Sequence, residues 1–284
     1  MAEFCQYASM GFLQRLMRRG GASPPPPPEP TWPPPDAQAE ADTGAASPRA
    51  AFAATGVDLP ELWHVGTVGQ ERPVWALLPD DGTTLEWWRR LRPLHDRTGW
   101  WPLLLGDPGD WIFDEWTDAD LDGDVEVARG LAMDVDVRLI EIVAEFATWD
   151  GEPPHGPART VAPNTGDDIR LAATPGVVGL VSAAAGYEVP GLVGWTGAAN
   201  HRLAGADHVA VLKRWHDRWG ADLIGLAQSE LEVVVSRPPQ DEADITAVAA
   251  EQYRYCPDVV EEDGAIEVFA ERQVRGHAWH FWWD

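Results

Sequence analysis

The amino-acid sequence predicts an α+β fold in which a mixed sheet packs against helices. Segments with apolar residues at helical spacing occur among short apolar runs bounded by glycine and proline, and two of these runs are close enough to form a hairpin. With 284 residues and 45% hydrophobic side chains, the chain can bury a sizeable core.

The first half of the folded part is expected at residues 52–150. A helix that begins at Thr83 should be disturbed at Pro93 and end at Gly99, where the chain enters a buried strand. The expected elements of this half are strands at 73–79 and 101–106 and helices at 83–99 and 124–149.

The second half is expected at residues 176–284, after a connecting loop at 151–175 that is rich in proline and glycine. The expected elements are strands at 177–184, 221–227, 231–236 and 277–284, helices at 206–220, 241–256 and 265–275, and a glycine-bent loop at 194–202.

One pattern occurs twice. The strings LEWWRRLRPLHDRTGWWPLLLG and HVAVLKRWHDRWGADLIGLA each combine a helical stripe, the triplet HDR, a glycine and an apolar run. Gly99 and Gly220 stand where a left-handed cap would release the chain into a strand. His95 and His216 fall on the apolar stripe, so we expect both to be satisfied at the edge of the core. The pattern fits a duplicated helix–Gly–strand unit, or a common local solution used twice.

The chain closes on HAWHFWWD, which predicts a strand with aromatic residues on both faces. Trp279, Phe281 and Trp283 share one face, whereas Trp282 shares the other with His280. Because both faces carry tryptophan, we expect this strand to be covered on each side, in a central or near-central position of the sheet.

Residues 1–51 are expected to form a disordered leader. The tract ASPPPPPEPTWPPPDAQAEADTGAASPRA cannot bury apolar area and predicts an extended linker. The preceding MAEFCQYASMGFLQRLMRRGG has a short amphipathic pattern, which fits a weak membrane anchor or a frayed leader. No apolar run of signal-peptide or membrane-spanning length follows it.

Composition restricts the partners. A formal net charge of −25 disfavours phosphate backbones and anionic lipid surfaces, so we expect neither nucleic acid nor membrane as a partner, whereas a basic protein suits this charge. Cys5 and Cys256 form no disulfide framework, which fits a reducing compartment such as the cytoplasm. The sequence contains no GxSxG, Walker loop, GxGxxG or HExxH, and we expect no cofactor.

Five strings of the second half carry a family resemblance: GWTGAAN, VLKRWHDRWGADL, SRPP, AAEQYRYCPD and WHFWWD. In this order and spacing they resemble an uncharacterised bacterial family known as domain of unknown function 4253. The string WRRLRPLHDRTGWWPLL of the first half is also similar to that family. The resemblance spans residues 60–284 and is densest from residue 192. It implies one continuous folded unit that excludes the Pro-rich leader, and it implies no particular activity.

The stretch DADLDGDVEVAR begins like a calcium-binding loop, in which alternate carboxylates surround a hard cation. Its last position is Arg129, where a bidentate glutamate should complete the shell, so the alternative is a solvated acidic turn. The candidate calcium ligands are Asp118, Asp120, Asp122 and Asp124.

Cys256 is a candidate nucleophile, with Glu251, Asp258 and His280 as candidate acid–base partners. However, Cys256 shares one face of the predicted helix with apolar residues, which favours a small buried side chain. A reactive cysteine also needs accessible, electropositive surroundings, and this stretch is acidic.

The loop GWTGAANHR is the candidate contact loop for a ligand. Its glycines allow close backbone approach, while Trp195, Asn200 and His201 offer binding groups; the alternative is a structural turn. His277 and His280 do not form a zinc pair, because their odd spacing sends the two side chains to opposite faces of a strand.

Two functions from different classes fit these observations. The first is a non-enzymatic protein-interaction module, of adaptor or immunity type, whose acidic surface binds a basic partner. The second is a hydrolase or transferase of unrecognised class, with a pocket around Asn200, His201, Glu251, Cys256 and Asp258. The charge and the lack of familiar catalytic motifs favour the first.

Overall fold

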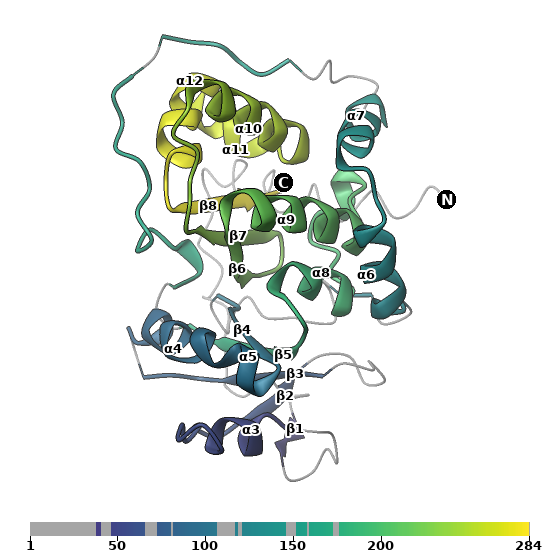
Figure 1. Cartoon of the computed structure of the whole chain (residues 1–284), viewed down its shortest axis with the longest axis vertical. Helices are drawn as coiled ribbons and strands as arrows, with labels where there is room; N and C mark the ends of the chain where they lie inside the picture. Colours follow the sequence, from purple (N-terminus) through teal and green to yellow (C-terminus); the bar gives the residue numbers. More distant parts are fainter. Residues whose placement is uncertain are drawn as a thin grey trace, which may run out of the picture.

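A computed structural model of the protein describes residues 38–40, 47–65, 73–80, 82–106, 117–118, 121–145, 152–157, 159–172 and 176–283. Within these residues a single mixed sheet has the strand order β1-β2-β3-β5-β4-β6-β7-β8, and helices pack against it (Figure 1). The predicted α+β class is confirmed. None of the described helices is long and apolar enough to span a bilayer.

The strands are β1 (Gln38–Ala39), β2 (Trp63–Val65), β3 (Val74–Leu77), β4 (Trp100–Leu104), β5 (Val178–Ser182), β6 (Ala221–Leu226), β7 (Glu230–Val235) and β8 (Ala278–Trp282). The α-helices are α3 (Arg49–Ala53), α4 (Thr84–Leu91), α5 (His95–Thr98), α6 (Gly123–Leu131), α7 (Val135–Glu145), α8 (Val189–Leu192), α9 (Gly205–Trp219), α10 (Glu242–Tyr255), α11 (Asp258–Asp263) and α12 (Ile266–Phe269). Short 3-10 turns are η2 (Arg92–Leu94), η5 (Arg170–Ala172), η6 (Gly186–Glu188) and η7 (Ala199–His201), and η8 (Ala270–Val274) is a π-helical turn.

The sheet joins the two halves of the chain. Its strands pair antiparallel, except that β4 and β6 are parallel neighbours. β5 belongs to the second half but lies between β3 and β4 of the first half. The expected halves at 52–150 and 176–284 therefore share one sheet. The predicted β6–β7 hairpin is confirmed.

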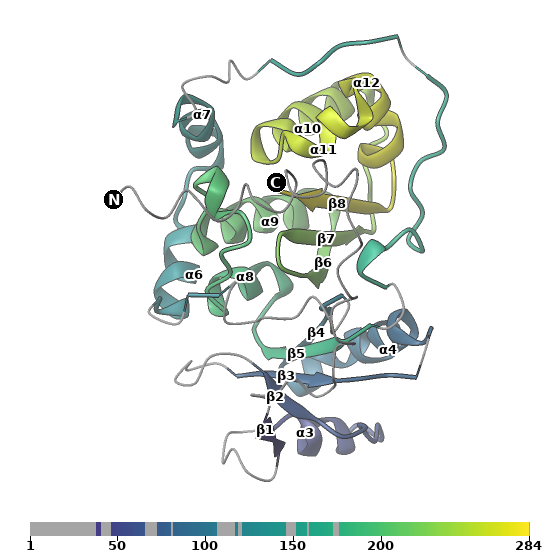
Figure 2. The same ribbon diagram turned by 180° about the vertical axis from the view of Figure 1, so that it is seen from behind.

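The sheet separates two apolar layers, because successive side chains of a strand point to opposite faces. In β4, Trp101 packs in one layer with Trp215 of α9, whereas Trp100 packs in the other with Trp88 of α4. Figures 1 and 2 show α9, α10 and α11 beside β6–β8, and α3, α4 and α5 beside β2–β5.

Both copies of the helix–Gly–strand pattern form the expected local structure. Gly99 and Gly220 adopt left-handed φ values of 72° and 64°, and the chain then enters β4 and β6. His95 and His216 both have hydrogen-bond partners, as expected. Although the two strands are parallel neighbours, α4 and α9 pack in opposite layers. The two segments thus share a local motif but not its packing.

β8 is the last strand of the sheet, so the expected central position is wrong. Its aromatic face is nevertheless enclosed: Trp279, Phe281 and Trp283 are each at most 2% exposed. Trp215 of α9 stacks on Phe281 with ring centroids 5.1 Å apart. Helices therefore bury this aromatic face even though β8 lies at the edge of the sheet.

Side chains from other segments close the outer edge of β8. An edge strand normally leaves backbone groups open to a further strand. Here Asn164 Nδ2 donates to the Ala278 carbonyl at 3.1 Å, the His280 N–H donates to Gln273 Oε1 at 3.0 Å, and Cys256 Sγ donates to the Trp282 carbonyl at 3.0 Å. We refer to these contacts as the edge seal.

The described fold begins before residue 52, where the sequence analysis placed its start. β1 pairs with β2, and α3 begins at Arg49, whose guanidinium donates to two carbonyl oxygens at 2.7 and 2.9 Å. Phe52 is fully buried. The expected leader at 1–51 therefore includes part of the fold, and most of the leader, including Cys5, lies outside the described residues.

His208 of α9 is fully buried among aromatic rings. Its Nδ1 shares a 2.5 Å hydrogen bond with the Tyr255 hydroxyl, and the rings of Trp195 and Trp283 lie 4.7 and 5.6 Å away. Its Nε2 has no partner among the described residues. Burial lowers the pKa of His208 to about 4, because the imidazolium cannot be solvated here. The core therefore holds this ring in its neutral form.

Replacing Trp279 by Ala should lower the free energy of unfolding by about 3–5 kcal/mol, because the indole is completely buried. Trp282→Ala is the matched control, since that indole is on the same strand but only half-buried, and its replacement should cost less. Urea titration followed by circular dichroism measures both variants. Equal losses would contradict the unequal burial of the two indoles.

Stability should fall as the pH drops from 6.5 towards about 4, because the unfolded chain then binds a proton that the folded His208 excludes. A pKa shift of this size corresponds to about 3 kcal/mol. His208→Phe removes the titration, so its free energy of unfolding should depend less on pH than that of the wild type. Urea titrations at both ends of this pH range measure the difference, and equal pH dependence of the two proteins would refute the assignment.

Candidate functional site

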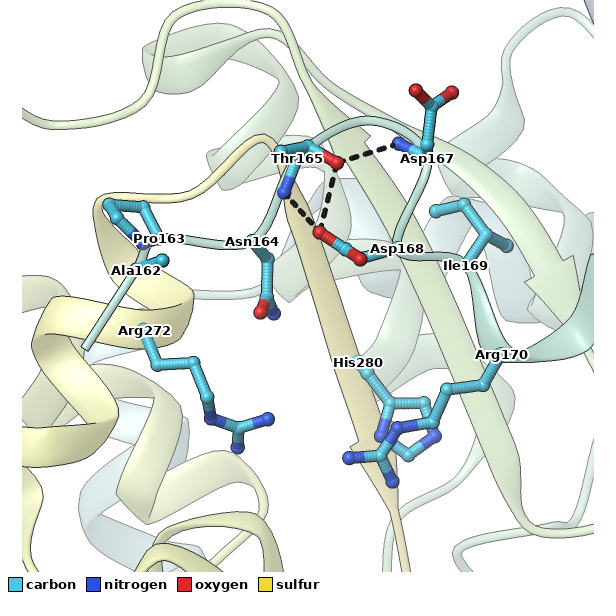
Figure 3. A pocket seen from close by; sticks show the side chains of 10 residues that line it. All are labelled: Ala162, Pro163, Asn164, Thr165, Asp167, Asp168, Ile169, Arg170, Arg272 and His280. Atoms are coloured by element: carbon cyan, nitrogen blue, oxygen red, sulfur yellow. Dashed lines mark hydrogen bonds between the residues drawn. The ribbon is translucent and has the colours of Figure 1, made fainter.

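A cavity of about 560 Å³ lies between β8, η8 and the segment that connects the two halves. We call it the β8 cavity. Its lining comprises residues 162–165 and 167–170 together with Arg272 and His280. Ligand pockets commonly measure ~300–1,000 Å³, so the cavity suits a small molecule. In Figure 3 the side chains of Arg170, Arg272 and Asn164 extend towards the strand that carries His280.

Acidic side chains orient two of the basic groups. Arg272 places Nε and Nη2 at 3.1 and 2.7 Å from one carboxylate oxygen of Asp263. His280 places Nε2 at 3.2 Å from Glu230, and the hydrogen bond from His280 is the main cause that lowers the pKa of Glu230. Arg272 and His280 are therefore held in place from one side, which leaves their other nitrogen atoms for the cavity.

Glu232 of β7 positions the turn that carries Arg170. Its carboxylate accepts the backbone N–H groups of Arg170 and Leu171, both at 2.8 Å, and burial raises the pKa of Glu232. The Arg170 side chain is 44% exposed and lies 3.6 Å from Glu262, which is too long for a hydrogen bond. The backbone of Arg170 is thus fixed while its guanidinium can still move.

Each of the two carboxylates of the cavity lining has a partner. Asp168 accepts the backbone N–H and the hydroxyl of Thr165 at 2.6 and 2.9 Å, and these bonds lower the pKa of Asp168. Asp167 pairs with Arg89, and Figure 3 shows its carboxylate pointing away from β8. Of the two carboxylates, Asp167 therefore points away from β8, whereas Asp168 is held by Thr165 within the lining.

Cys256 is completely buried at the end of α10 and contacts the Trp282 carbonyl. Burial, with a smaller contribution from the Asp258 carboxylate, raises the pKa of the Cys256 thiol well above its ordinary value. The thiol therefore remains protonated at neutral pH, which agrees with the packing role that its helix face predicted.

The candidate partners of Cys256 lie in different surroundings. Glu251 accepts the indole N–H of Trp215 at 2.9 Å and lies 3.3 Å from Arg214, and burial raises the pKa of Glu251. His280 lines the β8 cavity, on the face of β8 that points away from the aromatic layer. The structure does not assemble Cys256, Glu251 and His280 into one site.

The candidate contact loop is partly enclosed. Asn200 is exposed and accepts the backbone N–H of His201 at 3.1 Å, and His201 Nε2 lies 3.3 Å from Asp258. Trp195 is only 1% exposed and donates its indole N–H to the Ala227 carbonyl at 2.8 Å. The structure thus brings together His201 and Asp258, whereas Trp195 belongs to the core.

The acidic stretch of the candidate calcium loop leads into α6. Asp122 caps this helix, because its carboxylate accepts the backbone N–H groups of Asp124 and Val125 at 3.0 and 3.1 Å. Asp118 is exposed, and Asp120 lies outside the described residues. Among the residues that the structure describes, no group of three or more His, Cys, Asp or Glu side chains could hold a metal ion.

The cavity was not predicted from the sequence, because residues 151–175 were expected to form only a connecting loop. A Pro/Gly-rich stretch between apolar runs is typical of a linker. One local signal was present: the string NTGDD at 164–168 has turn chemistry, and its side chains do bond neighbouring backbone groups. The roles of Arg170 and Arg272 depend on contacts with distant segments, so no local pattern marks them.

A second surface feature lies on α6 and α7. The large hydrophobic side chains that are exposed in the described residues are Leu121, Val125, Leu131, Val137 and Ile140, with exposures between 38% and 65%. The exposed carboxylates of the same stretch are Asp122, Asp124, Asp134, Asp136 and Glu141. We call this outer surface of residues 121–141 the apolar–acidic ridge.

Contacts on the inner side of the two helices fix the ridge outward. Glu126 accepts the Ala206 N–H at the start of α9 at 3.0 Å, and Arg138 donates to Asp207 at 2.7 Å. At Gly130 the helices approach so closely that a Cβ would lie 2.5 Å from the Ala206 carbonyl oxygen. The exposed apolar side chains cannot turn inward without breaking these contacts.

In a Cys5→Ser variant, the thiol of Cys256 should not react with Ellman's reagent at neutral pH until the protein is unfolded. Absorbance of the released thiolate gives the reaction rate in buffer and in urea. A fast reaction in buffer would show that Cys256 is accessible, and would return it to the candidate nucleophiles.

Comparisons with known proteins bear on the second half of the chain. No curated protein and no solved structure matches the chain. One family model matches, and the matched residues include β5–β8 and the cavity residues Arg272 and His280, but not the apolar–acidic ridge. Residues 177–284 match the model of the family described as domain of unknown function (DUF4253), which is the family that the sequence resembles.

Proposed function

We propose that the protein is a non-enzymatic protein-interaction module, of adaptor or immunity type, that binds a basic partner through the apolar–acidic ridge. The observation that supports this most directly is the position of the exposed large apolar side chains of the described residues, which all lie between Leu121 and Ile140. Exposed large apolar side chains that are concentrated in one stretch of the chain mark a candidate interaction site.

The charges of the ridge define the chemistry of the partner. Arg129 is exposed on the ridge but pairs with the buried Glu126, and the side chain of Arg138 is only 17% exposed. Asp136 pairs with Arg214 of α9 at 2.7 Å, so the carboxylates that leave the ridge acidic are Asp122, Asp124, Asp134 and Glu141. An amphipathic helix with lysine or arginine beside its apolar face complements such a surface. The formal net charge of −25 adds attraction at long range.

The alternative, a hydrolase or transferase centred on Cys256, has less support. A buried thiol with a raised pKa is a poor nucleophile at neutral pH. The candidate bases Glu251 and His280 are bonded to groups in other parts of the structure.

A synthetic amphipathic helix of leucine and lysine should bind the wild-type protein, and a scrambled peptide of the same composition should bind at least tenfold more weakly. The double variant Val137→Ser and Ile140→Ser should also weaken binding at least tenfold, or about 1.4 kcal/mol, because it removes two exposed apolar side chains. Fluorescence anisotropy of the labelled peptide measures the affinity, which should fall as salt is added.

The control variant is Glu86→Gln with Asp96→Asn, which removes two exposed charges from α4 and α5 and leaves the ridge intact. It should bind the peptide almost as tightly as the wild type. If the control variant loses affinity while the ridge variant keeps it, binding depends on net charge alone and the ridge is not the interface.

A further inference from the structure

We propose that the β8 cavity binds a small molecule that carries a single carboxylate group. The proposal is independent of the ridge, because other residues carry it. It starts from the polar groups that the cavity presents: the guanidinium groups of Arg170 and Arg272, which are donors, and the imidazole of His280.

The two arginines have donors to spare. Arg272 uses Nε and Nη2 on Asp263, and no described residue accepts a hydrogen bond from its Nη1. The guanidinium of Arg170 contacts Glu262 only at 3.6 Å. Because Asp263 orients the Arg272 guanidinium from one side, Arg272 can donate to a carboxylate oxygen at little cost in side-chain entropy, whereas Arg170 must be ordered by the ligand.

His280 supplies a different type of contact. Because Glu230 accepts from Nε2, the nitrogen that remains for a ligand is Nδ1, which in the neutral ring is an acceptor. The ring is only 6% exposed, so this contact would be shielded from bulk water. A hydroxyl or ammonium group next to the carboxylate of the ligand fits this position.

The remaining lining limits the size and charge of the ligand. Ala162, Pro163 and Ile169 add apolar surface, which suits a short aliphatic body. Carboxylates adjoin the basic groups and offset part of their charge: Glu230, Glu232, Glu262, Asp263 and the lining residue Asp168. With a formal net charge of −25 over the whole chain, a polyphosphate would be repelled more strongly than a monoanion.

The test is isothermal titration of the full chain with acetate, butyrate and lactate at low chloride. Inorganic phosphate and acetamide serve as the anionic and neutral comparisons. We expect saturable binding of at least one carboxylate, tenfold or more weaker binding of acetamide, and tighter binding of lactate than of the other carboxylates through its hydroxyl.

Arg272→Gln and Arg170→Gln should each weaken carboxylate binding at least tenfold. The matched control is Arg275→Gln, three residues along the chain from Arg272, whose guanidinium pairs with Glu271 and Glu242 instead of facing the cavity. It should bind like the wild type. Because Arg272→Gln also removes an ion pair with Asp263, the partly exposed Arg170 provides a variant that leaves this pair in place.

Three outcomes would overturn the proposal: no saturable binding of any carboxylate, tighter binding of phosphate than of every carboxylate, or unchanged affinity in Arg170→Gln. The ridge variant Val137→Ser with Ile140→Ser should bind the carboxylate normally. A lack of carboxylate binding therefore does not contradict the proposal for the ridge. A lack of peptide binding likewise does not contradict the proposal for the cavity.

Discussion

The edge seal of β8 is the constraint on which the C-terminal part of the structure depends. A strand at the edge of a sheet exposes backbone groups that can recruit another chain. Here Asn164, Gln273 and Cys256 occupy three of those groups, and they come from the connecting segment, η8 and the end of α10. The seal therefore holds three segments, distant in sequence, against one strand.

The same contacts explain why a cavity forms there. Asn164 must reach the Ala278 carbonyl, so the connecting segment crosses beside β8 instead of taking a shorter path. Glu232 then anchors the next turn through the backbone of Arg170. Between these two attachments the segment bridges β8 and η8, and its lining residues enclose the β8 cavity. The cavity is thus a consequence of closing the sheet edge with a loop.

The sequence predicted those parts of the fold that depend on local spacing. The helix–Gly–strand units, the β6–β7 hairpin and the core side of α10 follow from the period of apolar residues and from Gly99 and Gly220. The edge position of β8 was not predictable in this way. Tryptophan on both faces of a strand indicates that both faces are buried. It does not say whether a second sheet, helices or a loop packs against each face. A central or near-central position between helices was expected because strands that are buried on both faces usually lie inside a sheet covered by helices, but helices can also cover a strand at the edge.

In the candidate site, too, the features that depend on local spacing were predicted and those that depend on distant segments were not. The burial of Cys256 followed from its helix face, because burial needs only the local period. The β8 cavity joins residues that lie far apart in the sequence, such as Asn164 and His280, and two of its basic groups acquire their orientation from Asp263 and Glu230. None of these pairings leaves a short-range pattern in the chain.

The strand order of the sheet shows that the residues matched by the family model do not form a complete folding unit. The matched residues 177–284 contain β5, β6, β7 and β8, but β5 and β6 are not neighbours: β4, from the first half, lies between them and pairs with both. β5 pairs on its other side with β3, also from the first half. Without residues 74–104 the matched segment would leave both edges of β5 and one edge of β6 unpaired, with Leu180 and Ile224 exposed on one face. The folding unit must therefore extend towards the N-terminus beyond the match, at least to the strands that complete this sheet.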